Sequence, residues 1–275
     1  MKNEKVILIT GVSSGFGQAC AKHLSKKGYW VFGTSRHLDI GEFSESGQLG
    51  KLEIIRMDVN SDFSVMEAIR LIKEKAGRLD VLVNNAGIGI AGSIENTTTQ
   101  LVKLQFETNF FGLYRMIKET LPIMREQGSG LIVNISSLGG LIGLPFQGFY
   151  SASKFAVEGL SEALRIEVKP FGIIVVLIEP GDFHTGFTEH RLIGDLALND
   201  PAYQERFKRA LKAAEDSERK GASPEKIAHL LERIIKTNSP KLRYRLGPSS
   251  KLVALSKFVP QRVSEFAVRR YFKLL

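Results

Sequence analysis

Tyr150 and Lys154 are the residues whose types and spacing suggest chemistry most directly. Residues four apart on a helix lie on the same face, which would place the Lys154 ammonium beside the Tyr150 ring. A phenol titrates near ~10 in water, and a neighbouring cation favours its ionised form. The pair could therefore hold a phenol that exchanges protons near neutral pH, as an acid for a carbonyl or a base for an alcohol. The same spacing also arises by chance on surface helices, so the surrounding sequence has to decide.

A glycine-rich segment near the N-terminus is the second candidate. Val6 to Ile9 is a short apolar run, typical of a strand buried on both faces of a parallel sheet, and a helical pattern follows the glycines. Such a loop binds phosphate because glycines allow close backbone approach and the helix N-terminus offers free N–H groups. Alone it could be a simple turn, but in this context we expect dinucleotide binding by Gly11, Ser13, Ser14, Gly15, Phe16 and Gly17.

Ser35 and Arg36 end the second predicted strand, Trp30 to Ser35. In dinucleotide folds an acid near this place binds the ribose 2′-hydroxyl, whereas an arginine accommodates a 2′-phosphate. The pair therefore favours NADP(H), and NAD(H) stays possible because Asp39 lies close by. If no nucleotide binds, Arg36 is an ordinary surface cation. Residues 37–50 are expected to form a surface loop.

Asp58 and Val59 follow the third predicted strand, Leu52 to Met57. Asp58 could meet the adenine amino group of a nucleotide. It could equally cap the helix predicted over 62–76, because aspartate is a favoured N-cap residue.

Two further predicted strands end in small polar motifs. Leu79 to Val83 leads into Asn84-Asn85-Ala86-Gly87, and Gly130 to Ser136 leads into Ser137. Open parallel sheets bind ligands at the carboxyl ends of their strands, so both motifs should border the same site as Tyr150.

Asn109 lies among apolar neighbours in a helical region predicted from about Thr98 to Gln127. The amide could hold water or backbone in a proton path, or it could be a satisfied buried amide. The spacing does not favour either interpretation.

Together these segments resemble the short-chain dehydrogenase/reductases, with a likeness to hydroxysteroid dehydrogenases and carbonyl reductases. The resemblance covers residues 5 to about 185. It implies an α/β single-domain Rossmann fold with a doubly wound, seven-stranded parallel sheet and helices on both faces, a nicotinamide cofactor and direct hydride transfer. The motifs that carry it are, in chain order, Thr10-Gly11-x3-Gly15-x-Gly17, Asn84-Asn85-Ala86-Gly87, Asn109, Ser137, Tyr150-x3-Lys154 and Pro180-Gly181 with Thr185.

The resemblance also implies roles for four residues. Tyr150 would be the acid/base, and Lys154 would lower its pKa and hold the ribose of the cofactor. Ser137 would bind the carbonyl oxygen, and Asn109 would support a water that leads protons to Lys154. The remaining cofactor contacts would come from Asp58, Val59, Asn85, Ala86, Gly87, Pro180, Gly181, Phe183 and Thr185.

Two departures from the family pattern stand out. Ser14 precedes Gly15 where some NADP-preferring members have a basic residue, so the cofactor preference depends on Arg36 alone. Asp182 and His184 follow Pro180-Gly181 where small apolar residues are more usual. They could touch substrate or cofactor, and we assign them no catalytic role.

Residues 183–222 are expected to form a substrate lid. The pocket would take a hydrophobic alcohol, ketone or aldehyde, such as a steroid, a retinoid or another bulky carbonyl compound. Alternatively, half of the apolar residues in this region belong to the core. The predicted substrate contacts are Ser137, Leu138, Phe146, Tyr150 and Phe187.

The chain is predicted to divide into a catalytic domain, residues 1–248, and a basic amphipathic extension, residues 249–275. The last strand is expected over Leu242 to Leu246, and Pro260 separates two short helical patterns in the extension. The second pattern could lie on an anionic membrane surface or pack on its own subunit and cover the substrate pocket. Its predicted apolar face is Val263, Phe266, Ala267, Tyr271 and Leu274.

Composition limits the other function classes. The net charge of +9 is concentrated in residues 236–275, which contain ten basic residues against one acid, Glu265, so we expect no nucleic-acid partner. The single cysteine, Cys20, predicts a buried packing role. No signal peptide or membrane-spanning run is predicted, which favours a cytoplasmic protein. The five histidines show no metal-ligand spacing.

The expected enzyme would be a homodimer or homotetramer, as is usual in the family. A non-catalytic NADP-binding regulatory protein with the same fold is the alternative. Retention of Ser137, Tyr150 and Lys154 argues against it.

Overall fold

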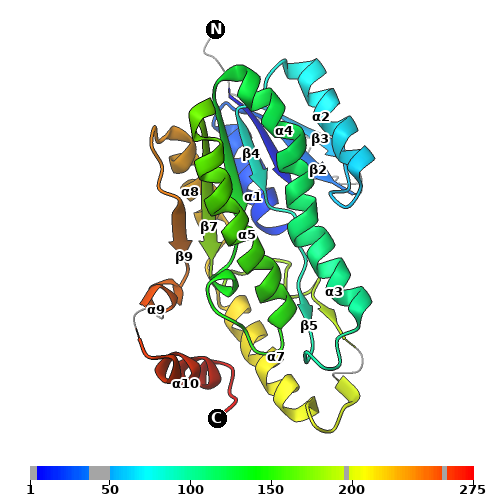
Figure 1. The fold of residues 1–275 in the computed structure, drawn as a ribbon, viewed down its shortest axis with the longest axis vertical. Coiled ribbons are helices and arrows are strands. Elements are labelled where there is room, and N and C mark those ends of the chain that lie inside the picture. The colour runs from blue at the N-terminus through cyan, green and yellow to red at the C-terminus, as the bar shows by residue number, and fades with distance from the viewer. Residues whose placement is uncertain (1–4, 37–49, 195–197, 256–258) are drawn as a thin grey trace.

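The protein folds around one parallel β-sheet, in a computed structural model that describes residues 5–36, 50–194, 198–255 and 259–275 (Figure 1). Within these residues the sheet has seven strands in the order β3-β2-β1-β4-β6-β7-β9, and every neighbouring pair is parallel. The strand order reverses between β1 and β4, where open sheets of this kind bind ligands. The strands are β1 (Val6–Thr10), β2 (Trp30–Ser35), β3 (Lys51–Arg56), β4 (Val81–Asn84), β6 (Gly130–Ile135), β7 (Ile173–Pro180) and β9 (Arg243–Leu246).

Helices cover both faces of the sheet, as predicted. Because successive strand residues point to opposite faces, Val6 and Leu8 enter one core while Ile7 and Ile9 enter the other. The first core is closed by α2 (Asp62–Ala76), α4 (Leu113–Gln127) and α5 (Gly148–Glu167), and the second by α1 (Gly15–Lys26) and α8 (Glu225–Lys236). Short 3-10 turns, η2 (Leu138–Gly140) and η3 (Lys169–Phe171), flank α5.

Cys20 lies in the second core and is 2% exposed. Burial raises the pKa of its thiol to about 12. The predicted packing role is therefore confirmed, and the thiol is unreactive at neutral pH.

Several predicted boundaries need correction. The fourth strand starts at Val81, because Gln127 binds both backbone groups of Leu79, at 2.8 and 3.0 Å. Asp58 does not cap α2: the N-cap is Ser61, whose hydroxyl accepts a hydrogen bond from the backbone N–H of Ser64. The loop predicted over 37–50, with Asp39, lies almost wholly outside the described residues.

The predicted helical region around Asn109 has three parts. α3 (Thr99–Phe106) is followed by the π-helix η1 (Glu107–Gly112) and then by α4. The wider π turn was not predicted, and such turns are frequent at functional sites.

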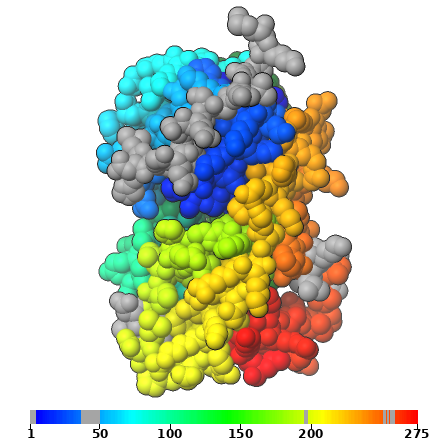
Figure 2. Space-filling view, turned by 180° about the vertical axis from the view of Figure 1, so that it is seen from behind, coloured from blue at the N-terminus to red at the C-terminus, as the bar shows by residue number. Residues whose placement is uncertain are grey.

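The predicted lid, residues 183–222, and the C-terminal extension lie together beyond the carboxyl ends of the strands. The lid contains α7 (Gln204–Arg219), and a small second sheet pairs β5 (Ile90–Ala91) with β8 (Leu192–Ile193). The extension forms α9 (Ser250–Leu255) and α10 (Gln261–Tyr271). Figures 1 and 2 show α10 beside α7 at the same end of the molecule.

The extension packs on its own subunit. Phe272 and Leu274 are buried in a cluster with Ala210 and Ala214 of α7, and Val268 packs against it. The predicted apolar face is wrong in part: Phe266 is 53% exposed, whereas Phe272, which was not assigned to it, is 3% exposed. No helix among the described residues is long and apolar enough to cross a membrane.

Candidate active site

A cavity of about 1000 Å³ opens at the carboxyl ends of the strands. It extends from the glycine loop after β1, past the ends of β2, β3, β4 and β6, to the lid and the C-terminal extension. The predicted cofactor residues that line it are Gly11, Ser13, Ser14, Gly15, Phe16, Ser35, Arg36, Asp58, Val59, Asn85, Ala86, Gly87, Tyr150, Lys154, Pro180, Gly181, Phe183 and Thr185.

The glycine loop has the geometry of an anion cradle. Gly11 and Gly15 have φ values of +70° and +56°, in the region that favours glycine. Ser14 is the N-cap of α1 but makes no side-chain capping bond, and the first turn carries no acid. The helix N-terminus therefore presents its N–H groups and positive dipole end to the cavity, which suits a pyrophosphate.

Gly17 is the predicted cofactor residue of this loop that does not line the cavity. A Cβ at this position would lie 2.2 Å from the Gly11 carbonyl oxygen and 2.5 Å from Nδ2 of Asn85. The glycine is thus required for close packing of the helix against the loop.

Asn85 holds the glycine loop against the end of β4. Its Nδ2 donates to the carbonyl oxygens of Thr10 and Gly11, at 2.8 and 2.9 Å. Oγ1 of Thr10 accepts from the backbone N–H groups of Asn85 and Ala86, at 3.0 and 2.9 Å. The Asn84-Asn85-Ala86-Gly87 motif therefore fixes the cavity floor by hydrogen bonds.

Arg36 and Asp58 lie at the two neighbouring strand ends that would border an adenosine. Arg36 is exposed and follows the buried, neutral Ser35. The Asp58 carboxylate accepts from the backbone N–H of Asn60 at 3.0 Å, a turn contact that leaves it on the cavity wall.

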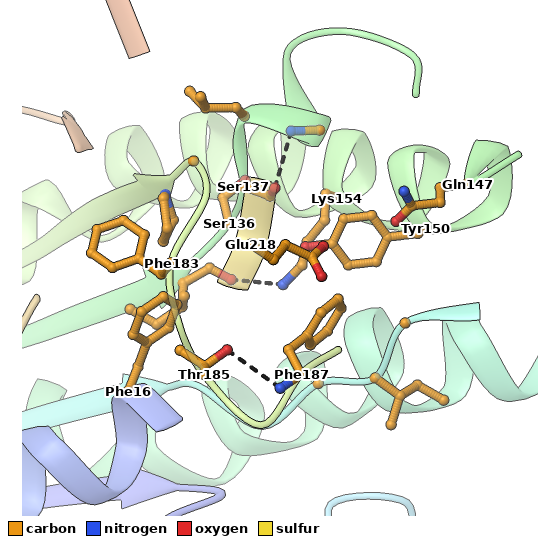
Figure 3. Close-up of a pocket in the computed structure, with 18 of the residues that line it drawn as sticks. Phe16, Ser136, Ser137, Gln147, Tyr150, Lys154, Phe183, Thr185, Phe187 and Glu218 are labelled. Atoms are coloured by element: carbon orange, nitrogen blue, oxygen red, sulfur yellow. Dashed lines mark hydrogen bonds between the residues drawn. The ribbon is translucent and has the colours of Figure 1, made fainter. Parts of the chain in front are cut away.

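Ser137, Tyr150 and Lys154 meet on the cavity wall, as Figure 3 shows. Nζ of Lys154 lies 5.9 Å from the Tyr150 ring centroid and donates to the Ile135 carbonyl at 2.8 Å. Oγ of Ser137 accepts from the Gly139 N–H at 3.0 Å and is hydrogen-bonded to Tyr150. A substrate oxygen could thus meet two hydroxyl groups at once.

The pKa of Tyr150 differs from the predicted direction. Burial raises it to about 12, and the hydrogen bond with Ser137 offsets only part of this effect. Burial also lowers the pKa of Lys154 to about 8, against the opposing charge of Glu158. Desolvation therefore outweighs the attraction between the pair, and the phenol is protonated at neutral pH.

Asn109 lies outside the cavity lining and is 1% exposed. Its Oδ1 accepts from the Ile88 N–H at 2.8 Å, and its Nδ2 donates to the Ile88 carbonyl and to Ser153 Oγ, at 3.0 and 3.2 Å. This geometry is that of a satisfied buried amide that fixes the backbone between the Asn-Ala-Gly motif and β5.

Of the five predicted substrate contacts, four line the cavity and one does not. Leu138 and Phe187 line the cavity, and the Phe187 ring lies 5.6 Å from that of Tyr150. Phe146 does not line it: this residue has a positive φ of 60° and packs behind the cavity against Phe207, with ring centroids 5.4 Å apart. At the end of the cavity beside the glycine loop, Phe183 packs edge-on against Phe16, with ring centroids 5.1 Å apart.

Glu218 also lines the cavity, and no role was predicted for it from the sequence. In α7, buried Phe207, Ala210 and Ala214 form an apolar stripe, and position 218 continues it by one more turn. A charged residue that continues a buried apolar stripe is the sequence signal that could have identified Glu218. Tyr271 of α10 also lines the cavity.

His23, His229 and Glu232 form the one cluster of possible metal ligands among the residues described. Their candidate atoms lie within 4.8 Å of one another because α1 and α8 pack together, a contact that spacing in the sequence did not predict. Glu232 accepts from Lys236 at 2.6 Å and contacts His23 at 2.6 Å, and the ring centroids of His23 and His229 lie 4.5 Å apart. None of the three lines the cavity.

Comparison with known proteins identifies relatives of this chain. The model of the short chain dehydrogenases matches residues 5–193. A 3-ketodihydrosphingosine reductase of Bacteroides thetaiotaomicron is 45% identical, over 98% of each chain. The human 17-beta-hydroxysteroid dehydrogenase type 1 is 37% identical, over 87% of this chain and 76% of that protein. The solved structure of ElxO with NADP bound has a TM-score of 0.72 and 28% identity, over 88% of this chain and 96% of that one.

Proposed function

The chain belongs to the short-chain dehydrogenases, an oxidoreductase family, and from that premise we propose that it reduces a hydrophobic ketone at the expense of NADPH. The observation that carries the proposal is the placement of Ser137, Tyr150 and Lys154 on one wall of a cavity whose other end is an anion cradle.

These three residues divide the work of reduction. When bound, NADPH supplies the hydride for the carbonyl carbon. Ser137 and the Tyr150 hydroxyl hold the carbonyl oxygen, and Tyr150 gives that oxygen its proton as negative charge develops. Lys154, 5.9 Å from the ring centroid, stabilises the phenolate that remains. Asn109 acts by holding the Ile88 backbone in place.

The raised pKa of Tyr150 favours the reductive direction. A phenol with a pKa of about 12 is protonated at neutral pH and is ready to act as an acid. Oxidation of an alcohol would require the deprotonated phenol, which burial disfavours.

NADP(H) is the preferred cofactor in this proposal, and NAD(H) remains a possible one. Arg36 lies on the cavity wall at the end of β2, where a cation accommodates a 2′-phosphate. The NADP-bound structure of the similar protein ElxO supports the assignment.

For the substrate, we propose a long-chain ketone. The relative that acts on 3-ketodihydrosphingosine, a long-chain amino ketone, matches nearly the full length of this chain, lid and extension included. The substrate end of the cavity is walled by apolar side chains from four segments: Leu138, Leu144, Phe187, Val253, Val263 and Phe272. A steroid is the second candidate, because the human relative at 37% identity is a hydroxysteroid dehydrogenase.

We also propose a homo-oligomer joined through α4 and α5. Phe111, Tyr114 and Phe155 are each more than 40% exposed, and they lie in η1, α4 and α5, respectively. Exposed aromatic side chains grouped in this way favour a subunit interface.

The test is oxidation of NADPH and of NADH, side by side, against long-chain ketones and a steroid ketone. We expect NADPH consumption that matches alcohol formation with a long-chain ketone. NADPH binding without turnover on any ketone would instead support the non-catalytic alternative.

A further inference from the structure

The substrate end of the cavity carries two carboxylates in a largely apolar wall. Glu218 of α7 and Asp182, which follows β7, both line it. Glu218 lies near enough to Tyr150 for its charge to raise the pKa of the phenol. Figure 3 shows the Glu218 carboxylate beside the Tyr150 ring, where the reacting carbonyl would be held.

Two neighbours in the predicted lid hold the Glu218 side chain in place. Its Oε1 accepts from Nη2 of Arg191, and its Oε2 accepts from the Thr188 hydroxyl at 2.5 Å. The side chain is 17% exposed, so it is fixed but still faces the cavity. A carboxylate has about four lone-pair positions, so both oxygens can accept a further donor.

Asp182 adds a second negative charge. Its Oδ2 accepts from Ser217 Oγ and from the Tyr271 hydroxyl, both at 3.0 Å, and both donors are neutral. No ion pair of the described residues involves Asp182. Burial raises the pKa of Glu218, and the charge of Asp182 also acts to raise it. Arg191 pairs with Glu218, whereas the donors to Asp182 are neutral, so both carboxylates can still attract a cation.

An apolar channel starts beside these carboxylates. It is the apolar part of the same cavity, and it is lined by Leu144, Ala214, Val263, Val268 and Phe272. Tyr271 connects the two features, because its ring is part of the channel and its hydroxyl binds Asp182. A ligand that matches both would carry a cation close to the ketone and an alkyl chain beyond it.

We propose that Glu218 and Asp182 form an anionic subsite that binds a protonated amine on the carbon next to the ketone of a long-chain substrate. This inference rests on the proposed reductase function and deepens it. The two carboxylates disfavour an anionic group at the same place. A neutral hydroxyl would satisfy the acceptors but would not balance their charge.

The experiment compares two ketones of equal chain length, one with an amino group beside the carbonyl and one without. The quantity measured is the ratio of their kcat/KM values with NADPH. We expect the wild type to prefer the amino ketone. Glu218→Gln should lower the ratio about 10- to 100-fold, the range expected for one lost charge-assisted contact. Glu215→Gln is the matched control, since Glu215 lies on the same helix outside the cavity lining and should leave the ratio unchanged.

A second measurement avoids dependence on a variant that could fold poorly. Calorimetry on the wild type with NADPH compares the binding of decylamine and decanol, and we expect the amine to bind at least about tenfold more tightly.

The outcomes separate the two proposals. If the amine-free ketone is reduced but neither the ratio nor the binding depends on the amine, the anionic subsite is wrong and the reductase function stands. If neither ketone is reduced, the proposed function fails, and equal binding of decylamine and decanol would then overturn the subsite as well.

Discussion

The two ends of the cavity are built from different kinds of contact. At the cofactor end, hydrogen bonds from Asn85 and Thr10 fix the glycine loop, and Gly17 packs against it with no room for a Cβ. At the substrate end, α10 packs on α7 through Phe272, and one hydrogen bond joins Tyr271 to Asp182. The first end is a rigid cradle within the sheet, whereas the second is a cover formed by two surface segments. Changes in the cradle should therefore affect every substrate, and changes in the cover should affect only those that reach it.

Among the changes that compare the two ends, the largest effect is expected from Gly17→Ala, which tests the rigidity of the cradle. The new Cβ would lie 2.2 Å from the Gly11 carbonyl oxygen, so the loop must move. We expect the NADPH Kd to rise about 100-fold and the free energy of unfolding to fall by about 1–3 kcal/mol. Gly143→Ala is the control, because nothing lies within 4 Å of a Cβ there and the residue is outside the cavity lining. NADPH titration and thermal unfolding measure both effects, and wild-type affinity in Gly17→Ala would show that the cradle is not rigid.

Arg36→Asp tests how the same end selects its cofactor. The change removes the cation proposed to bind the 2′-phosphate and introduces repulsion, so the ratio of kcat/KM for NADPH over NADH should fall about 30- to 100-fold. Arg56→Asp, at an exposed arginine outside the cavity lining, should leave the ratio unchanged. An unaltered preference in Arg36→Asp would disprove the assignment.

Phe272→Ala tests the cover. Phe272 is 3% exposed, and its loss should loosen α10 from α7. The KM for a long-chain ketone should rise about tenfold while the NADPH Kd stays at its wild-type value. Phe266→Ala on the same helix, at 53% exposure, is the matched control. If Phe272→Ala weakens NADPH binding as much as ketone binding, the two ends are not independent.

The smallest effect is expected from pH. Burial lowers the pKa of Lys154 from its usual value of 10.5 to about 8, so the ammonium is present below pH 8 and is lost above it. Tyr150, with its pKa of about 12, stays protonated throughout this range. We expect kcat/KM for reduction to fall about fivefold between pH 8 and pH 9. A profile that is flat to pH 9.5 would show that the charge of Lys154 is not needed.

The difference between the two ends also explains what could be predicted from the sequence. The sheet, the cradle and the Tyr150–Lys154 pair depend on short spacings within single strands, turns and helices, which the sequence displays directly. The cover depends on contacts between segments far apart in the chain, such as Asp182 with Tyr271, so neither Glu218 nor Phe272 was assigned to it. The pKa of Tyr150 was predicted in the wrong direction because pair spacing does not reveal burial.

Reduction of a long-chain ketone with NADPH that carries deuterium at the transferable position tests the proposed mechanism most directly. With the wild type, we expect one deuterium on the carbinol carbon of the product alcohol. With Tyr150→Phe, we expect a rate lower by about 100- to 10,000-fold and an NADPH Kd within a few-fold of the wild-type value, because only the proton donor is lost. Deuterium-labelled alcohol formed at the wild-type rate by Tyr150→Phe would show that Tyr150 is not the proton donor.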